Sequence, residues 1–310
     1  MAKKQFKAES KRLLDLMINS IYTHQEIFLR EIISNASDAI DKLAYQALTD
    51  EKVGLSRSDF AIELKPDETA RTLTVSDNGI GMDKDEMENN LGTICRSGSL
   101  QFKQALDKDK AADTDIIGQF GVGFYSSFMV AKEVTVTSRA YGEAEALTWK
   151  SDGIEGYTIE PATAEEAAAL GADHGTSITL HLKDNADEEK YDVFLDQYEL
   201  QALIKQYSNY VRYPIQMMVS KSRQKPKPED AGDDYKPEYE DYQELETVNS
   251  MTPIWKKRSS DVEQKDYDEF YKSTFHDFDD PARTISFHAE GTLEYDALLF
   301  VPGRAPFDLY

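Results

Sequence analysis

Four polar residues that could bind a metal ion or move a proton recur at helical spacing between about residues 25 and 48: Glu31, Asn35, Asp38 and Lys42. At 100° per residue they fall within a stripe about 60° wide. The apolar residues of the segment lie on the other side: Leu29, Ile32, Ile33, Ala36, Ile40, Leu43 and Ala47. Stacked carboxylate and amide groups could hold a hydrated Mg²⁺ and polarise a water molecule. The alternative is an ordinary solvated helix face.

Three glycine-containing segments could bring the backbone close to a ligand. Asp77-Asn78-Gly79-Ile80-Gly81 follows an expected strand at 73–76, where glycines permit close approach to a flat ligand; the alternative is a plain turn. Gly118-Gln119-Phe120-Gly121-Val122-Gly123-Phe124 precedes an apolar helix, where backbone N–H groups favour an anion; the alternative is tight packing. Gly175-Thr176 opens an expected strand at 177–182. The second segment has neither the Walker ending nor the dinucleotide-fingerprint spacing.

Net charge and cysteine content limit the partners of the chain. The 310 residues include 35 Lys and Arg against 58 Asp and Glu, a net charge of −23. Such a surface repels phosphate backbones and anionic lipid, so nucleic acid and membranes are not expected partners. One cysteine allows no intrachain disulfide. Because the sequence shows neither a signal peptide nor a membrane span, we expect a cytoplasmic protein.

Hydrophobic periodicity predicts helices followed by a series of strands. Helices are expected at 10–22, 25–48 and 187–210. A hairpin is expected at 60–75, with Pro66-Asp67-Glu68 as its turn. Strands are expected as an antiparallel meander at 133–138, 145–150, 156–160 and 176–182, with another at 215–219. The five histidines, which lack metal-ligand spacing, are expected to be structural: His24, His174, His181, His276 and His288.

The C-terminal third divides at an acidic segment. Residues 226–246 carry nine acidic residues and two lysines, a net charge of −7, which predicts a flexible linker. Beyond it, a capping-box pattern at 260–263 predicts a helix through Phe275, followed by strands at 284–289 and 293–301. We therefore expect domains at 1–220 and 251–310 joined by a linker at 221–250. The end of the chain carries no stop signal, which suggests a fragment of a longer protein.

The order of these motifs resembles the ATP-binding fold shared by DNA gyrase, histidine kinases, MutL and the 90-kDa heat-shock chaperones. Similarity to the bacterial heat-shock chaperones is carried by five segments: 29–39, 89–94, 118–126, 253–255 and 304–308. The resemblance implies an α+β fold, a two-layer sandwich of helices on a mostly antiparallel sheet. It also implies a lid at about 91–123 and the beginning of a second α/β domain.

The resemblance further implies roles for individual residues. Glu31 would be the general base that orients water, Asn35 would ligate Mg²⁺, and Asp77 would accept a hydrogen bond from the adenine amino group. The implied nucleotide-binding set is Asn35, Asp38, Lys42, Asp77, Gly81, Met82, Asn90, Leu91, Arg96, Ser97, Gly98, Gln119, Phe120, Gly121, Val122, Gly123, Phe124 and Thr176. Arg96 stands where the family often has lysine, which changes the geometry of its phosphate contact.

The function implied is that of an ATP-dependent chaperone of the stress response. It would bind ATP with Mg²⁺ and hydrolyse it slowly, and lid closure and dimer clamping would then act on unfolded client proteins. The family's middle-domain arginine and its dimerising domain would lie beyond Tyr310, so the chain alone would be a weak ATPase. Two alternatives stay open: a DNA-processing ATPase, which the charge of −23 disfavours, and a nucleotide-binding module without turnover.

Overall fold

The computed structural model describes residues 24–93, 98–99, 121–153, 156–186, 188–225, 239–291 and 294–305. The chain divides into two compact units, Met1–Asn249 and Ser250–Tyr310. In the described residues, no helix combines the length and apolar character needed to cross a membrane.

An eight-stranded sheet forms the first unit, in the order β5-β4-β3-β6-β2-β1-β7-β8. Its strands are β1 (Ile62–Asp67), β2 (Thr72–Asp77), β3 (Ala131–Arg139), β4 (Leu147–Ser151), β5 (Thr158–Pro161), β6 (Gly175–Leu182), β7 (Ile215–Gln224) and β8 (Tyr239–Thr247). The pairing of β1 with β7 is parallel and the other strand pairs are antiparallel. The α+β expectation is therefore confirmed.

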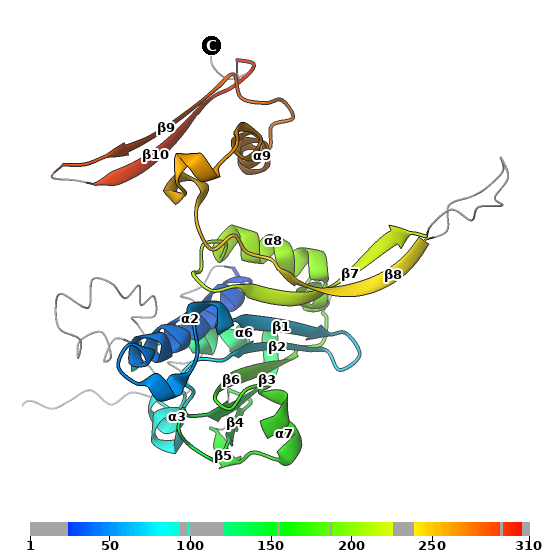
Figure 1. Cartoon of the computed structure of the whole chain (residues 1–310). Helices are drawn as coiled ribbons and strands as arrows, with labels where there is room; N and C mark the ends of the chain where they lie inside the picture. The colour runs from blue at the N-terminus through cyan, green and yellow to red at the C-terminus, as the bar shows by residue number, and fades with distance from the viewer. Residues whose placement is uncertain are drawn as a thin grey trace, which may run out of the picture. The chain divides into compact units, whose positions relative to one another are not determined.

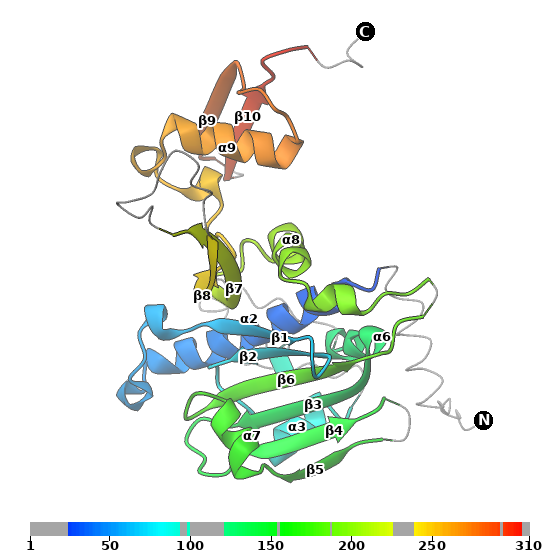
Figure 2. The ribbon, with the colours of Figure 1, turned by 90° about the vertical axis from the view of Figure 1, so that its right-hand side faces the viewer.

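The described helices lie mainly on one face of this sheet, and one short helix lies on the other. In its described residues the unit has the helices α2 (Ile27–Ala47), α3 (Lys84–Asn90), α6 (Ser127–Val130), α7 (Ala164–Ala169) and α8 (Gln197–Tyr207), and the 3₁₀ turns η1 (Glu51–Val53), η2 (Arg57–Asp59), η3 (Gly123–Ser126) and η4 (Asp192–Leu195). Figure 1 shows α2 and α3 on one side of the sheet and α7 on the other, and Figure 2, seen from the side of α7, shows α3 behind the strands.

The apolar side of α2 builds the core, as its spacing predicts. Phe28, Ile32, Ile33, Ile40 and Leu43 are fully buried, and α2 contacts β1, β2, η3, α6 and α8. Burying each such side chain is worth about 1.5–3 kcal/mol. The helix that carries the predicted residues Glu31, Asn35, Asp38 and Lys42 is thus held in a fixed orientation on the sheet.

Two sequence-based expectations about the sheet are wrong. Pro66 and Asp67 pair with Leu73 and Thr72, so the hairpin turn comes after Asp67, where Arg71 takes a φ of 54°. The four later strands are not a simple meander, because β6 lies between β3 and β2. This insertion brings the beginning of β6 next to the end of β2.

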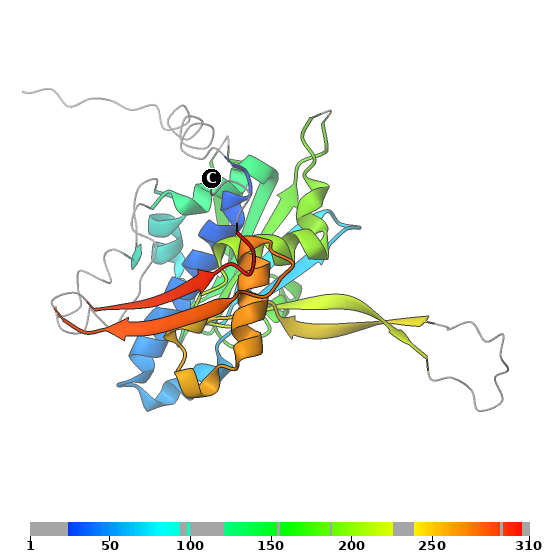
Figure 3. The same cartoon turned by 90° about the horizontal axis from the view of Figure 1, so that it is seen from above.

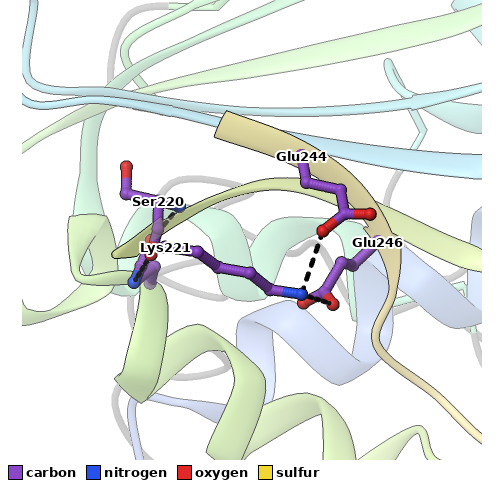
Figure 4. A network of polar contacts seen from close by, with 5 residues as sticks. Ser220, Lys221, Glu244 and Glu246 are labelled. Carbon is purple, nitrogen blue, oxygen red and sulfur yellow. Dashed lines mark hydrogen bonds and ion pairs between the residues drawn. The ribbon is translucent and has the colours of Figure 1, made fainter. Parts of the chain in front are cut away.

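The expected linker at 221–250 is wrong for the residues that form β7 and β8. These strands form a long hairpin that projects beyond the rest of the sheet (Figure 3), while 226–238 lie outside the described residues. Three acidic residues of β8 (Glu240, Glu244 and Glu246) form ion pairs with cations of β7 while their side chains stay partly exposed to solvent. Lys221 Nζ contacts Glu244 Oε2 at 3.1 Å and also pairs with Glu246 (Figure 4), and Arg223 Nε lies 2.6 Å from Glu240 Oε1.

The second unit contains a helix and a two-stranded antiparallel sheet. Its elements are η5 (Ile254–Lys256), η6 (Ser259–Asp261), α9 (Gln264–Phe275), β9 (Arg283–Ala289) and β10 (Tyr295–Val301). Aromatic rings of α9 pack on Phe300 of β10, with Tyr271 at a centroid distance of 5.2 Å. The helix and strands were expected, but the capping box is formed by Glu263 and Asp266 and begins the helix later than Ser260.

Candidate functional site

The polar stripe of α2 is not a solvated helix face. The Asp38 side chain is only 1% exposed, and Glu31, Asn35 and Lys42 are half-buried. Burial lowers the pKa of the Lys42 ammonium, an effect opposed by the nearby carboxylates of Asp38, Glu86 and Asp77. Charged groups are costly to bury without partners, so this stripe belongs to a polar site between α2 and its neighbours.

Asp77 is the buried carboxylate at the end of β2. Its Oδ1 accepts a hydrogen bond from the Gly79 N–H at 2.9 Å, and the Thr176 backbone also donates to the carboxylate. The register places Asp77 directly opposite Thr176 of β6. Burial outweighs these bonds and raises the pKa of Asp77 to about 7. The carboxylate is therefore fixed in position, and a hydrogen bond donated by a ligand would stabilise its buried charge.

The loop after Asp77 is tied to its surroundings on several sides. The Ile80 N–H donates to the Ala39 carbonyl of α2 at 3.0 Å. Asn78 bridges to the segment before β1, donating to the Asp59 carbonyl and accepting from the Ala61 N–H. Gly81 has a φ of 68°, and a Cβ there would lie 1.9 Å from the Arg139 carbonyl oxygen. Glycine is therefore required where the backbone passes β3.

Ser138 of β3 connects this loop to the beginning of β6, and sequence reasoning missed it. Its Oγ donates to the Gly175 carbonyl, lies 2.9 Å from Thr176 Oγ1 and accepts from the Met82 N–H. One fully buried hydroxyl thus holds two predicted adenine-pocket residues, Met82 and Thr176. A serine within an alternating strand pattern does not stand out in the sequence. The contacts of Ser138 arise only because β6 lies next to β3 in the sheet.

The carboxylate of Glu31 lies against the glycine-rich turn. A Cβ on Gly123 would come within 2.3 Å of Glu31 Oε2, so glycine is required for this approach. The neighbouring Arg30 donates through Nη2 to Glu31 Oε1 at 2.5 Å. Within this turn Gly121, which precedes Val122, has a φ of 65°. Phe124 at its end is buried, and its ring packs against Trp149, Tyr125 and Phe128. The predicted base and the predicted phosphate loop are therefore neighbours.

A third part of the site joins the end of α3 to the glycine-rich turn. Leu91 accepts a hydrogen bond from the Tyr125 hydroxyl at 2.8 Å. A Cβ on Gly98 would lie 2.7 Å from Asn90 Oδ1, so these two predicted residues are adjacent. The other predicted residues lie outside the described part of the chain: Arg96, Ser97, Gln119 and Phe120.

Family models match both units of the chain. Residues 22–184 match the model described as histidine kinase-, DNA gyrase B- and HSP90-like ATPase. The chain belongs to this family of ATPases. Residues 227–310 match the model described as Hsp90 protein. The ATPase match covers α2, β2, the glycine-rich turn and Thr176, so it spans the described site.

Curated relatives of this chain are named as chaperones. The chain is 53% identical over its whole length to chaperone protein HtpG of Clostridium acetobutylicum, 52% to that of a Clostridium botulinum strain and 50% to that of Shouchella clausii. In each case the alignment covers 100% of this chain and 47% of the relative. The chain thus spans about half the length of the curated relatives it matches.

Proposed function

We propose that this chain is the nucleotide-binding part of an ATP-dependent chaperone that binds ATP with Mg²⁺ and hydrolyses it slowly. The observation that carries the proposal is the buried Asp77 carboxylate, held at a strand end by Gly79 and Thr176. The match of residues 227–310 to the Hsp90 model favours a chaperone over a DNA-processing ATPase.

In this proposal Asp77 selects the base. Its carboxylate accepts a hydrogen bond from the exocyclic amino group of adenine. Guanine presents a carbonyl oxygen at the equivalent position and would leave the carboxylate facing an acceptor, so the site rejects it. Thr176 supports the same region through water, and Gly81 and Met82 line the base pocket.

Glu31 acts as general base and orients the attacking water. Gly123 allows the carboxylate to lie beside the backbone amides of the glycine-rich turn, which would cradle the terminal phosphates. The ion pair with Arg30 orients the carboxylate.

Mg²⁺ fits the residues present at this site. Asn35 would hold the ion, with Asp38 and Lys42 behind it on α2. The Asn35 amide, half-buried on α2, offers an oxygen ligand of the kind that Mg²⁺ takes, and the ion usually keeps several waters and binds largely through substrate phosphates. When bound, the ion neutralises phosphate charge.

The wider cycle belongs to the same proposal. Lid closure over about 91–123 and clamping of a homodimer would act on unfolded client proteins in the cytoplasm, with neither nucleic acid nor membrane as partner. Most of the lid range lies outside the described residues, so support for this cycle comes from the family and its named chaperone relatives.

Calorimetric titration of ADP with Mg²⁺ into the parent chain and into Asp77→Asn tests the proposal. We expect saturable binding by the parent and its loss in a folded variant. Asp85→Asn, which changes an exposed aspartate of α3, should bind as the parent does. A folded parent that takes up no ADP would refute the proposal.

A further inference from the structure

His174 contacts the same loop that carries the predicted adenine-binding residues. It precedes β6, and its Nδ1 lies 2.8 Å from the Gly79 carbonyl oxygen, 95 residues away in sequence. Because a carbonyl oxygen only accepts, Nδ1 carries the proton in this bond. The half-buried ring also packs edge-on against Tyr141, with centroids 5.6 Å apart. These contacts agree with the structural role expected of His174 and tie that role to the 77–81 loop.

The Gly79 peptide groups are thereby held from both sides. The Gly79 N–H donates to Asp77 Oδ1, while its carbonyl accepts from His174. The next carbonyl, that of Ile80, accepts from the Tyr141 N–H at 2.8 Å. His174 and Tyr141 therefore hold two consecutive carbonyls, those of Gly79 and Ile80, in the loop after Asp77.

We propose that His174 is a positioning residue for base recognition: it orients the Gly79 backbone so that the Asp77 carboxylate faces the adenine amino group. This inference depends on the proposed function. His174 itself touches neither substrate nor reacting atoms. A protonated and a neutral imidazole can both donate through Nδ1, so the bond does not require one charge state. Its loss would let the 77–81 loop relax and would weaken the preference for adenine.

Two substitutions separate the hydrogen bond from ring packing. His174→Phe keeps an aromatic ring against Tyr141 and removes the donor, whereas His174→Asn places an amide donor near the position of Nδ1. By the usual worth of one such bond, the phenylalanine variant should bind ADP about 3- to 10-fold more weakly. Its ADP-to-GDP affinity ratio should fall by a similar factor, and asparagine should restore most of both. His181→Phe, further along β6 and near Glu133, is the matched control.

The test is calorimetric titration of ADP and GDP with Mg²⁺ into the parent and these variants, with melting curves of the nucleotide-free proteins. Parent affinity and parent base preference in folded His174→Phe would overturn the inference while leaving the proposed function intact. Equal weakening in the phenylalanine and asparagine variants, with a lowered melting temperature in both, would reduce His174 to a structural role and also overturn it. A folded parent that binds neither nucleotide would overturn the proposed function and this inference together.

Discussion

At the scale of single residues, burial decides how the two key carboxylates behave. Asp77 is 8% exposed and receives only backbone donors in the described structure, whereas Glu31 is half-buried and paired with Arg30. The first carboxylate is suited to recognising a neutral donor, and the second to acting on water.

Asp77 should make folding stability depend on pH. Its pKa is about 7 in the folded chain against an ordinary value of 3.8, so between these values the folded state holds a proton that the unfolded state releases. The contribution of the protonated Asp77 carboxyl to the free energy of unfolding is therefore fully present below about pH 4 and is lost as pH rises through 7. Urea unfolding at pH 5 and 8 should show a larger loss for the parent than for Asp77→Asn. An identical loss in both would contradict the assignment.

Replacing Glu31 should separate binding from turnover. Glu31→Gln removes the base but keeps the shape of the side chain, so ATP hydrolysis should fall about 100-fold or more, with ADP affinity changed by less than about 3-fold. A single-turnover assay with calorimetry measures both. Glu88→Gln, at an exposed position on α3, should hydrolyse ATP at the parent rate. If Glu31→Gln hydrolysed ATP at that same rate, Glu31 would not be the general base.

At the scale of elements, the first unit ends in a polar clamp. The Asn249 side chain accepts from the Ile215 N–H at 2.8 Å and donates to the carbonyls of Val211 and Tyr213 at 3.0 Å each. Tyr213 in turn donates to Asp41 Oδ1 of α2 at 2.5 Å. This clamp fixes the start of β7 and the end of β8 against the site-bearing helix.

Removing the clamp should destabilise the first unit. Asn249→Ala leaves buried backbone groups without partners, so the free energy of unfolding should fall by about 2–3 kcal/mol. Thr247→Ala, at the exposed last position of β8 and two residues before Asn249, should cost under about 0.5 kcal/mol. Denaturant unfolding measures the difference, and equal small losses in both variants would show that water satisfies the freed groups.

The sequence allowed prediction of elements with strong periodicity, such as helix α2 (Ile27–Ala47). It also singled out candidate site residues by their types, such as Asp77, and their roles stay predictions. Strand β8 was missed because its acidic residues suggested a solvated linker, although Lys221 and Arg223 of β7 form ion pairs with them across the hairpin. Ser138 and His174 were missed because their contacts join segments far apart in sequence. Such contacts depend on the order of the strands in the sheet, which local sequence patterns do not reveal.

At the scale of the whole molecule, the two compact units should unfold separately. The described candidate residues lie between Glu31 and Thr176, all in the first unit. A chain ending at Asn249 should therefore fold and bind ADP with the parent affinity. Calorimetric melting of the parent should show two transitions. Saturating ADP, at about 100 times its Kd, should stabilise one of them by about 2.7 kcal/mol, and a single transition shifted as a whole would contradict this independence.

The parallel pairing of β1 with β7 has a consequence for biosynthesis. Ile62 pairs with Ile215, so 215 − 62 = 153 residues must be added after β1 begins before its neighbour exists. At about 5–20 residues per second this takes about 8–30 s. During that interval β1 is an unprotected edge strand on the nascent chain, able to pair with other extended segments. A protein proposed to act on unfolded clients would itself pass through a stage in which it needs such protection.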